Sequence, residues 1–235
     1  MHKQLLFAAT LILSLFLVAF KWAHQAALPA LKYISRSEAM RNKFTMQCSP
    51  DWRFLNSDSL VNGITILDGW GDYRWDIESK SDSTRLYFQQ GINMYYSFYI
   101  IGAMASFKKA ARFDENNAMI WWAQALVYGP NINDYASDIP AKAYTAAQKA
   151  VAFSPANGTK EKVLIRAMAV RYSTDTAAGR SMLNQLYADK MEEAYQQFPH
   201  DADIGALYAD ALMLQHPWQY WKHDGEAQPW TGPIL

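Results

Sequence analysis

The chain has 235 residues, of which 51% are hydrophobic and 19% charged, so it can bury a substantial core and is not disordered over most of its length. Lysine plus arginine and aspartate plus glutamate both number 22, so no overall electrostatic field favours nucleic acid or an anionic membrane. Aromatic residues are abundant, with 9 Trp, 14 Tyr and 11 Phe, and such rings fill helix interfaces or line ligand grooves.

Residues 1–27 have the layout of a secretory signal. His2 and Lys3 precede an unbroken apolar run over residues 5–20, and Lys21 follows the run. The run is shorter than the roughly 20 residues that a transmembrane helix needs, so a signal peptide and an uncleaved membrane anchor are both open. Either one predicts export, to the periplasm or to the outer face of the inner membrane.

Residues 28–83 are expected to form an irregular N-terminal segment, because prolines and the turn-rich residues 68–72 interrupt any long helical period. A short helix over residues 37–44 is predicted within it, and an extended piece or loop is predicted after Gly63. Cys48 is the only cysteine of the chain, so it has no disulfide partner there, and no companion ligand gives it a metal site.

From residue 84 the pattern changes to long helical periods that recur at the spacing of a tetratricopeptide (TPR) repeat. With Gly91 at the eighth position of the first unit, Tyr87 takes the fourth, Ala103 the twentieth and Phe107 the twenty-fourth. Small residues are needed at the eighth and twentieth positions, where paired helices approach closely. The sequence therefore predicts an all-α, TPR-like α-solenoid of antiparallel helix pairs over residues 84–235.

Two further pairs and a half repeat complete the predicted order. The second unit opens at Trp121, and an insertion after Gly129 and Pro130 separates its two helices. The third unit has its helices over residues 160–172 and about 179–197. A last first helix over residues 202–214 has no partner helix, which would leave an apolar face open. We therefore expect the chain to be truncated there or covered by a partner chain.

Six short segments follow one another in a distinctive order: residues 117–126, 129–133, 161–165, 171–173, 207–213 and 217–221. In this order they resemble a family of exported bacterial TPR proteins, a similarity that covers roughly residues 68–235. The resemblance implies further helical repeats past the equivalent of Leu235, but no activity, because no biochemical role is attached to the family. Where relatives carry histidines, this chain has residues 71–75 and Tyr99, so the resemblance argues against a metal site.

No catalytic motif is present in the sequence: it lacks a phosphate-binding loop, a Gly-x-Ser-x-Gly elbow, a His-Glu-x-x-His motif and a haem-attachment cysteine pair. His216 and His223 are seven residues apart, but Pro217 disfavours a continuous helix between them. We therefore predict a binding protein that is not an enzyme and that has no cofactor and no metal.

The first helices of the pairs are expected to form a groove, by analogy with other TPR domains. The predicted lining residues are Phe88, Tyr95, Tyr96, Trp122, Leu126, Leu164, Met168, Arg171, Tyr172, Asp210 and Met213. Among them Tyr95, Tyr96, Trp122, Arg171 and Tyr172 are the predicted partner-binding residues, for an apolar or aromatic segment of a protein or peptide. The alternative is that the N-terminal segment folds back and fills the groove itself.

A second candidate site combines polar and aromatic side chains. Its residues are Asn131, Asn133, Asp134, Trp218, Tyr220 and Trp221. In one interpretation they bind a small polar ligand such as a sugar, which predicts a periplasmic ligand-binding module or an accessory subunit of an enzyme. In the other, the Asn and Asp side chains only hold a turn, and residues 217–221 close the end of the core.

Overall fold

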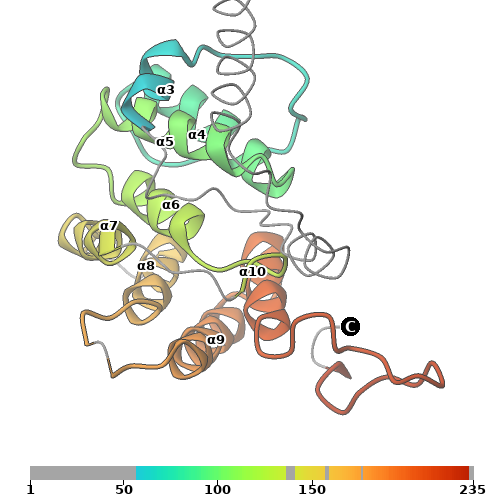
Figure 1. Ribbon diagram of the computed structural model, residues 1–235. Coiled ribbons are helices and arrows are strands. Elements are labelled where there is room, and N and C mark those ends of the chain that lie inside the picture. Colours follow the sequence, from blue (N-terminus) through green and yellow to red (C-terminus); the bar gives the residue numbers. More distant parts are fainter. Residues whose placement is uncertain (1–56, 136–140, 157–158, 176, 233–235) are drawn as a thin grey trace, which may run out of the picture. The chain divides into compact units, whose positions relative to one another are not determined.

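The computed structural model describes residues 57–135, 141–156, 159–175 and 177–232. Over these ranges the chain is all-α, with eight helices and no β-strand (Figure 1). The predicted signal or anchor at residues 1–27, the predicted helix at residues 37–44 and Cys48 lie outside the described residues. Within the described ranges, no helix combines the length and the apolar character that crossing a bilayer requires.

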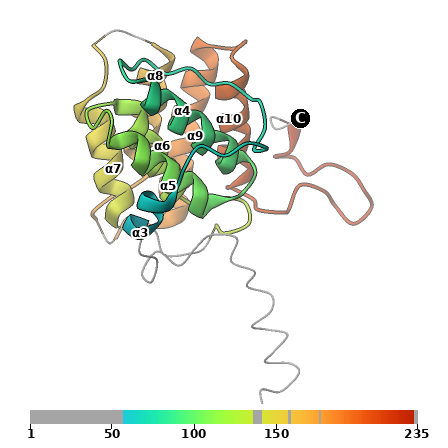
Figure 2. The same ribbon diagram turned by 90° about the horizontal axis from the view of Figure 1, so that it is seen from above.

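Adjacent helices pack in pairs, as the residue spacing predicts (Figures 1 and 2). The pairs are α4 (Asp82–Tyr96) with α5 (Ile100–Ala111), α6 (Ala118–Tyr128) with α7 (Ala141–Ala152), and α8 (Lys160–Val170) with α9 (Arg180–Gln197). α10 (Ala202–Met213) packs on α9, and α3 (Ser57–Gly63) packs on α5. The prediction of α4 to α10 is confirmed, whereas α3 is a helix that the spacing does not predict.

The first helix of each pair, and α10 likewise, begins at a side chain that caps it. Ser81, Asn117, Thr159 and Asp201 each accept a hydrogen bond from a backbone N–H in the first turn of α4, α6, α8 and α10. These bonds satisfy donors that have no partner inside the helix. The N-cap residues of α5 and α9, Tyr99 and Gly179, make no such bond. The first helices therefore carry the stronger start signals.

The interior is built around α6. Ten of its eleven residues are buried, and it packs against α4, α5, α7 and α8. A helix that is apolar on all sides is stable only when other elements surround it. In the first pair, Gly91 lies directly under the Phe107 ring, because a Cβ atom at Gly91 would come within 2.6 Å of that ring. The small residue expected at this position therefore allows α4 and α5 to approach closely.

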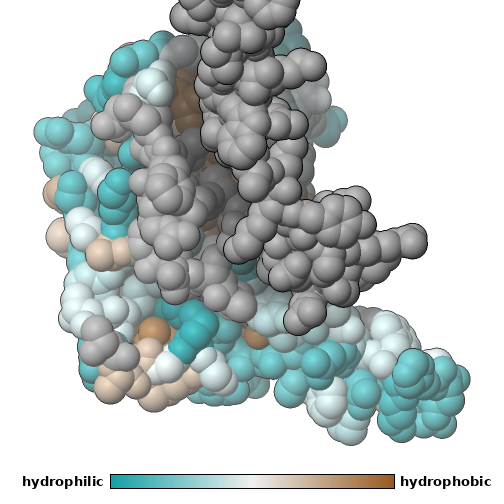
Figure 3. All heavy atoms as spheres, viewed as in Figure 1, coloured by the Kyte–Doolittle hydropathy of each residue, from teal (hydrophilic) through white to brown (hydrophobic). Residues whose placement is uncertain are grey.

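The stretch after α10 folds without a further α-helix in residues 214–232. The His216 ring stacks on Trp230 with 4.2 Å between centroids, and Thr231 donates a 2.6 Å hydrogen bond to the Tyr220 carbonyl. On the face in Figure 3 this stretch is mostly hydrophilic. This stretch contacts the end of α10 through the Tyr220 hydroxyl, which donates to the Met213 carbonyl at 2.9 Å.

Two glycine substitutions test the packing. Gly91→Ala forces the Phe107 ring to move, so we expect it to lower the free energy of unfolding by about 2 kcal/mol. Gly205→Ala, inside α10, brings its new methyl group to an ordinary 3.6 Å from Tyr195, so we expect a gain of about 0.5–1 kcal/mol from helix propensity. Urea denaturation measures both. Equal changes in the two variants would contradict the close approach at Gly91.

Candidate binding site

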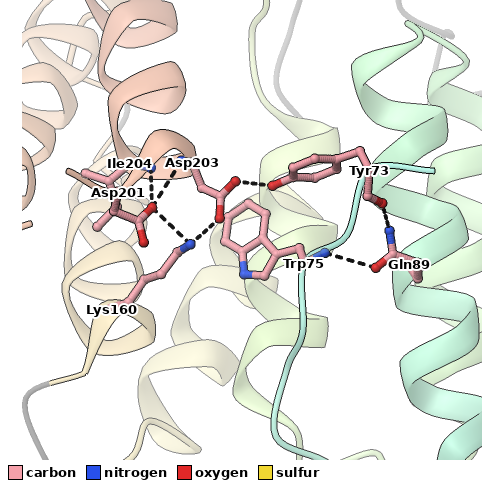
Figure 4. Close-up of polar contacts among 7 residues, drawn as sticks. All are labelled: Tyr73, Trp75, Gln89, Lys160, Asp201, Asp203 and Ile204. Atoms are coloured by element: carbon pink, nitrogen blue, oxygen red, sulfur yellow. Dashed lines mark hydrogen bonds and ion pairs between the residues drawn. The ribbon is translucent and has the colours of Figure 1, made fainter. Parts of the chain in front are cut away.

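A stretch of extended chain lies across the first helices (Figure 4). We call residues 68–81 the crossing segment. Its Trp75 ring contacts Phe88 of α4 and Trp122 of α6, with centroids 6.3 and 5.4 Å away, and the ammonium of Lys160 at the start of α8 lies 4.6 Å above it. At α10, the Tyr73 hydroxyl donates a hydrogen bond to Asp203. One short stretch therefore contacts α4, α6, α8 and α10.

The backbone of the crossing segment is held by amide side chains. Gln89 accepts from the Trp75 N–H at 3.0 Å and donates to the Tyr73 carbonyl, and Asn93 donates to the same carbonyl at 2.9 Å. Farther along, Asn117 donates to the Glu78 carbonyl at 2.7 Å. An amide carries a donor and an acceptor, so it matches the two polar groups of a peptide unit. These contacts fix the path of the segment.

Charged side chains at the starts of α8 and α10 bind one another and the crossing segment. The Lys160 ammonium forms ion pairs with Asp201 at 3.0 Å and with Asp203, the carboxylate that also accepts from Tyr73. Burial acts to raise the pKa of Asp201, but the Ile204 N–H and Lys160 outweigh it and lower that pKa overall. Burial and the bond to Asp203 raise the pKa of Tyr73, so the phenol stays protonated and acts as a donor.

Beside the crossing segment lies a group that we call the arginine cluster: the buried Arg171, Tyr172 and Tyr187 and the partly buried Tyr95 and Asp210. Arg171 is fully buried, and its guanidinium lies 4.3 Å from the centre of the Tyr187 ring. It donates to the Pro130 carbonyl at 2.8 Å, while Tyr172 donates to the Ala125 carbonyl at 2.6 Å. Both bonds satisfy carbonyls at the end of α6 or just after it.

Several polar atoms of the arginine cluster are buried without a hydrogen-bond partner in the described part of the chain: Nε and Nη1 of Arg171, the Tyr187 hydroxyl and Oδ2 of Asp210. Burial raises the pKa of Asp210, although the nearby Arg171 acts to lower it. Burial opposes the charge of Arg171, but the surrounding tyrosine oxygens and Asp210 outweigh it, and the pKa of Arg171 is raised. The cluster therefore contains buried donors and a buried acceptor that no described residue pairs with, and such groups cost free energy.

The predicted partner-binding residues fall into two groups. Tyr95 and Tyr96 are adjacent on α4, with 5.7 Å between ring centroids, and electrostatic interactions link Tyr95 to Arg171 and Asp210. Tyr96 is 39% exposed. Trp122, Arg171 and Tyr172 are buried, as are Phe88, Leu126, Leu164 and Met168 of the predicted lining. The expectation of an open aromatic groove along all first helices therefore does not hold, because the crossing segment covers Phe88 and Trp122 and the helices cover one another.

Of the aromatic residues of the second candidate site, Trp218 lies at the Asn131 loop, although the two are far apart in the sequence. The Trp218 indole donates to the Ile132 carbonyl at 2.9 Å, which places that ring at the loop of Asn131, Asn133 and Asp134. Within the loop, the Asn131 side chain accepts from the N–H groups of Asn133 and Asp134 at 2.9 and 3.1 Å. These bonds are those of a turn held by an Asn side chain. Trp218 and Trp221 stay mostly exposed, whereas the Tyr220 hydroxyl is used by Met213.

The residues that make the site were not predicted from the sequence. In the crossing segment Tyr73, Trp75 and Ile77 point inward, and the alternate residues 74, 76 and 78 are exposed. This alternation is the signal of an extended segment with one buried face, and it is readable from the sequence. Tyr187 carries no comparable signal, because its partner Arg171 lies in another helix.

The raised pKa of Asp210 gives a pH dependence that can be tested. A carboxyl group with a raised pKa in the folded state binds a proton more tightly there, so stability falls as pH rises above the ordinary Asp pKa. Asp210→Asn removes this penalty, so we expect it to raise the free energy of unfolding near pH 7 and to change it little near pH 4. Denaturation of the exposed Asp189→Asn variant is the control, and a destabilised Asp210→Asn at neutral pH would contradict the assignment.

No group of His, Cys, Asp and Glu side chains within the described ranges has the arrangement of a metal site. Comparisons of the chain with protein-family models, with curated proteins and with solved structures found no match.

Proposed function

We propose that the protein is an exported, non-catalytic scaffold of the TPR type that binds an extended segment of a partner protein beside its crossing segment. The observation that carries this proposal is the crossing segment itself. It is a stretch of extended polypeptide seated on the first helices, with two inward aromatic rings and with backbone groups paired to Gln89, Asn93 and Asn117. A surface that holds one extended chain in this way has the chemistry to hold a second.

The second chain in this proposal lies at Tyr96, which is 39% exposed, beside the arginine cluster. The groups of Arg171, Tyr187 and Asp210 that no described residue pairs with are buried behind that position. Tyr96 and Tyr95 lie next to these groups on α4 and offer ring surface for an apolar or aromatic side chain. The partner in this proposal is therefore a peptide segment with an apolar or aromatic side chain, and not a bulk acidic or basic surface.

The repeat type and the location are parts of the same proposal. The pairing of α4 to α9, with Gly91 under Phe107, supports a TPR-like solenoid. The resemblance of residues 117–133 and 207–221 to exported bacterial TPR proteins supports the same repeat type. Export, to the periplasm or the outer face of the inner membrane, rests on the apolar run at residues 5–20.

Site-specific photo-crosslinking in cells tests the proposal. A photoreactive phenylalanine derivative replaces Tyr96 in one variant and Tyr195 of α9 in the other. The two tyrosines are matched in exposure, at 39% and 38%, so equal accidental contact is expected at both positions. We expect a discrete protein adduct, several-fold stronger at position 96, because partner contacts concentrate at buried polar anchors and the rings beside them.

Equal labelling at positions 96 and 195, or labelling at neither, would contradict partner binding at this face. Trp122→Ala and Tyr172→Ala are unsuitable as binding variants, since both side chains are core residues and their loss would destabilise the fold by roughly 3–5 kcal/mol. The crosslinking pair avoids this confusion because both of its positions are at the surface.

A second candidate function is a module for a small polar ligand such as a sugar. The observation that favours it is the bond between Trp218 and the Asn131 loop, which holds a 67% exposed indole beside polar side chains. Stacking of a sugar ring on Trp218 would quench and shift its fluorescence. A response to sugars that disappears in Trp218→Phe but persists in Trp230→Phe would support this function.

A further inference from the structure

A pocket of about 370 Å³ lies between α5, α6 and α7, with Val61 of α3 at its edge. Its lining includes neither a residue of the crossing segment nor one of the arginine cluster. The volume lies in the range of sites that hold small organic molecules. The pocket is thus separate from the face proposed to bind a partner.

The charged side chains among the described lining residues are all positive. Lys108, Arg112 and Lys142 line the pocket, and none of the described lining residues is acidic. Lys108 and Arg112 lie at the end of α5, where cations are favourable because they offset the partial negative charge of the carbonyl end. Lys142 is in the first turn of α7, where a cation is unfavourable, and within the described residues it has no ion pair. An anion in the pocket would compensate the charge of Lys142 and would be attracted by the cations at the end of α5.

A residue with a buried donor that no described residue pairs with forms part of the pocket wall. Gln124 of α6 is 4% exposed, and its Nε2 has no hydrogen-bond partner in the part of the chain that the structure describes. Leaving such a group unpaired costs roughly 1–3 kcal/mol, so a native protein seldom leaves it without an acceptor. Gln124 lines the pocket, and an oxygen bound there would accept from it.

Apart from Thr145, the remaining lining is apolar or aromatic, with Trp121 as its largest ring. The Trp121 indole is fixed in place because its Nε1 donates to the Glu115 carbonyl at 2.7 Å and the Lys149 ammonium lies 3.9 Å over the ring. A rigid ring beside cations suits a ligand with a flat apolar body and an anionic end. We infer that this pocket binds a small aromatic or similarly flat organic anion, with its carboxylate or phosphate between Lys142, Arg112 and Gln124.

Binding is measured by titrating the full chain with phenyl phosphate and with benzoate while following the indole N–H resonance of Trp121, assigned through Trp121→Phe. Inorganic phosphate and benzyl alcohol separate the anionic from the apolar requirement. We expect saturable binding of at least one aromatic anion, on the order of 1 mM or tighter, and at least tenfold weaker binding of the two partial ligands. Gln124→Met and Lys142→Gln are each expected to weaken binding about tenfold.

Lys109→Gln is the matched control, since Lys109 is also in the last turn of α5 but lies toward Tyr87 and outside the pocket. An unchanged dissociation constant in Lys109→Gln supports the site, whereas equal weakening in all three variants overturns it. Absence of saturation by both aromatic anions, or binding of inorganic phosphate as tight as that of phenyl phosphate, also overturns it. Crosslinking at position 96 is unaffected by these variants, so failure here is distinguishable from failure of the proposed partner binding.

Discussion

The buried guanidinium of Arg171 is the constraint on which much of the structure depends. A cation removed from water must be compensated, and Arg171 donates to the Pro130 carbonyl just after α6 and lies against the Tyr187 ring of α9. The hydrogen bond from Arg171 also satisfies a carbonyl just after α6, so Arg171 links the second helix pair to the third. Arg180 strengthens this link by donating to the Arg171 carbonyl at 2.5 Å.

The crossing segment determines which parts of the first helices stay uncovered. Its Trp75 ring covers part of the surface of α4 and α6. The arginine cluster beside it contains hydrogen-bonding groups that no described residue pairs with. The fold-back of the N-terminal segment and the binding of a partner were alternatives on sequence grounds. In the structure the crossing segment covers one part of this face and the proposed partner site lies beside it, so a filled face and the proposed binding face are compatible.

The helix order was predictable because its determinants are local. Gly91 and Phe107 are sixteen residues apart in one pair, and Thr159 and Asp201 are ordinary capping residues at fixed distances from apolar positions. The site was only partly predictable, because its contacts join distant parts of the chain. Arg171 was expected as an accessible cation of a groove, and its burial depends on Tyr187 and on the end of α6, which no spacing rule connects to it.

The hydrogen bond from Tyr73 to Asp203 joins residues that are 130 positions apart. Tandem helix pairs ordinarily contact only their neighbours, so their stabilities add along the chain and an end pair can open alone. Here the same short stretch is fastened to α4 and to α10, so neither end of the array can open without breaking contacts at the other. The helices should therefore unfold as one cooperative unit. The array should also bend less than an array of helix pairs that lacks such a contact between its ends.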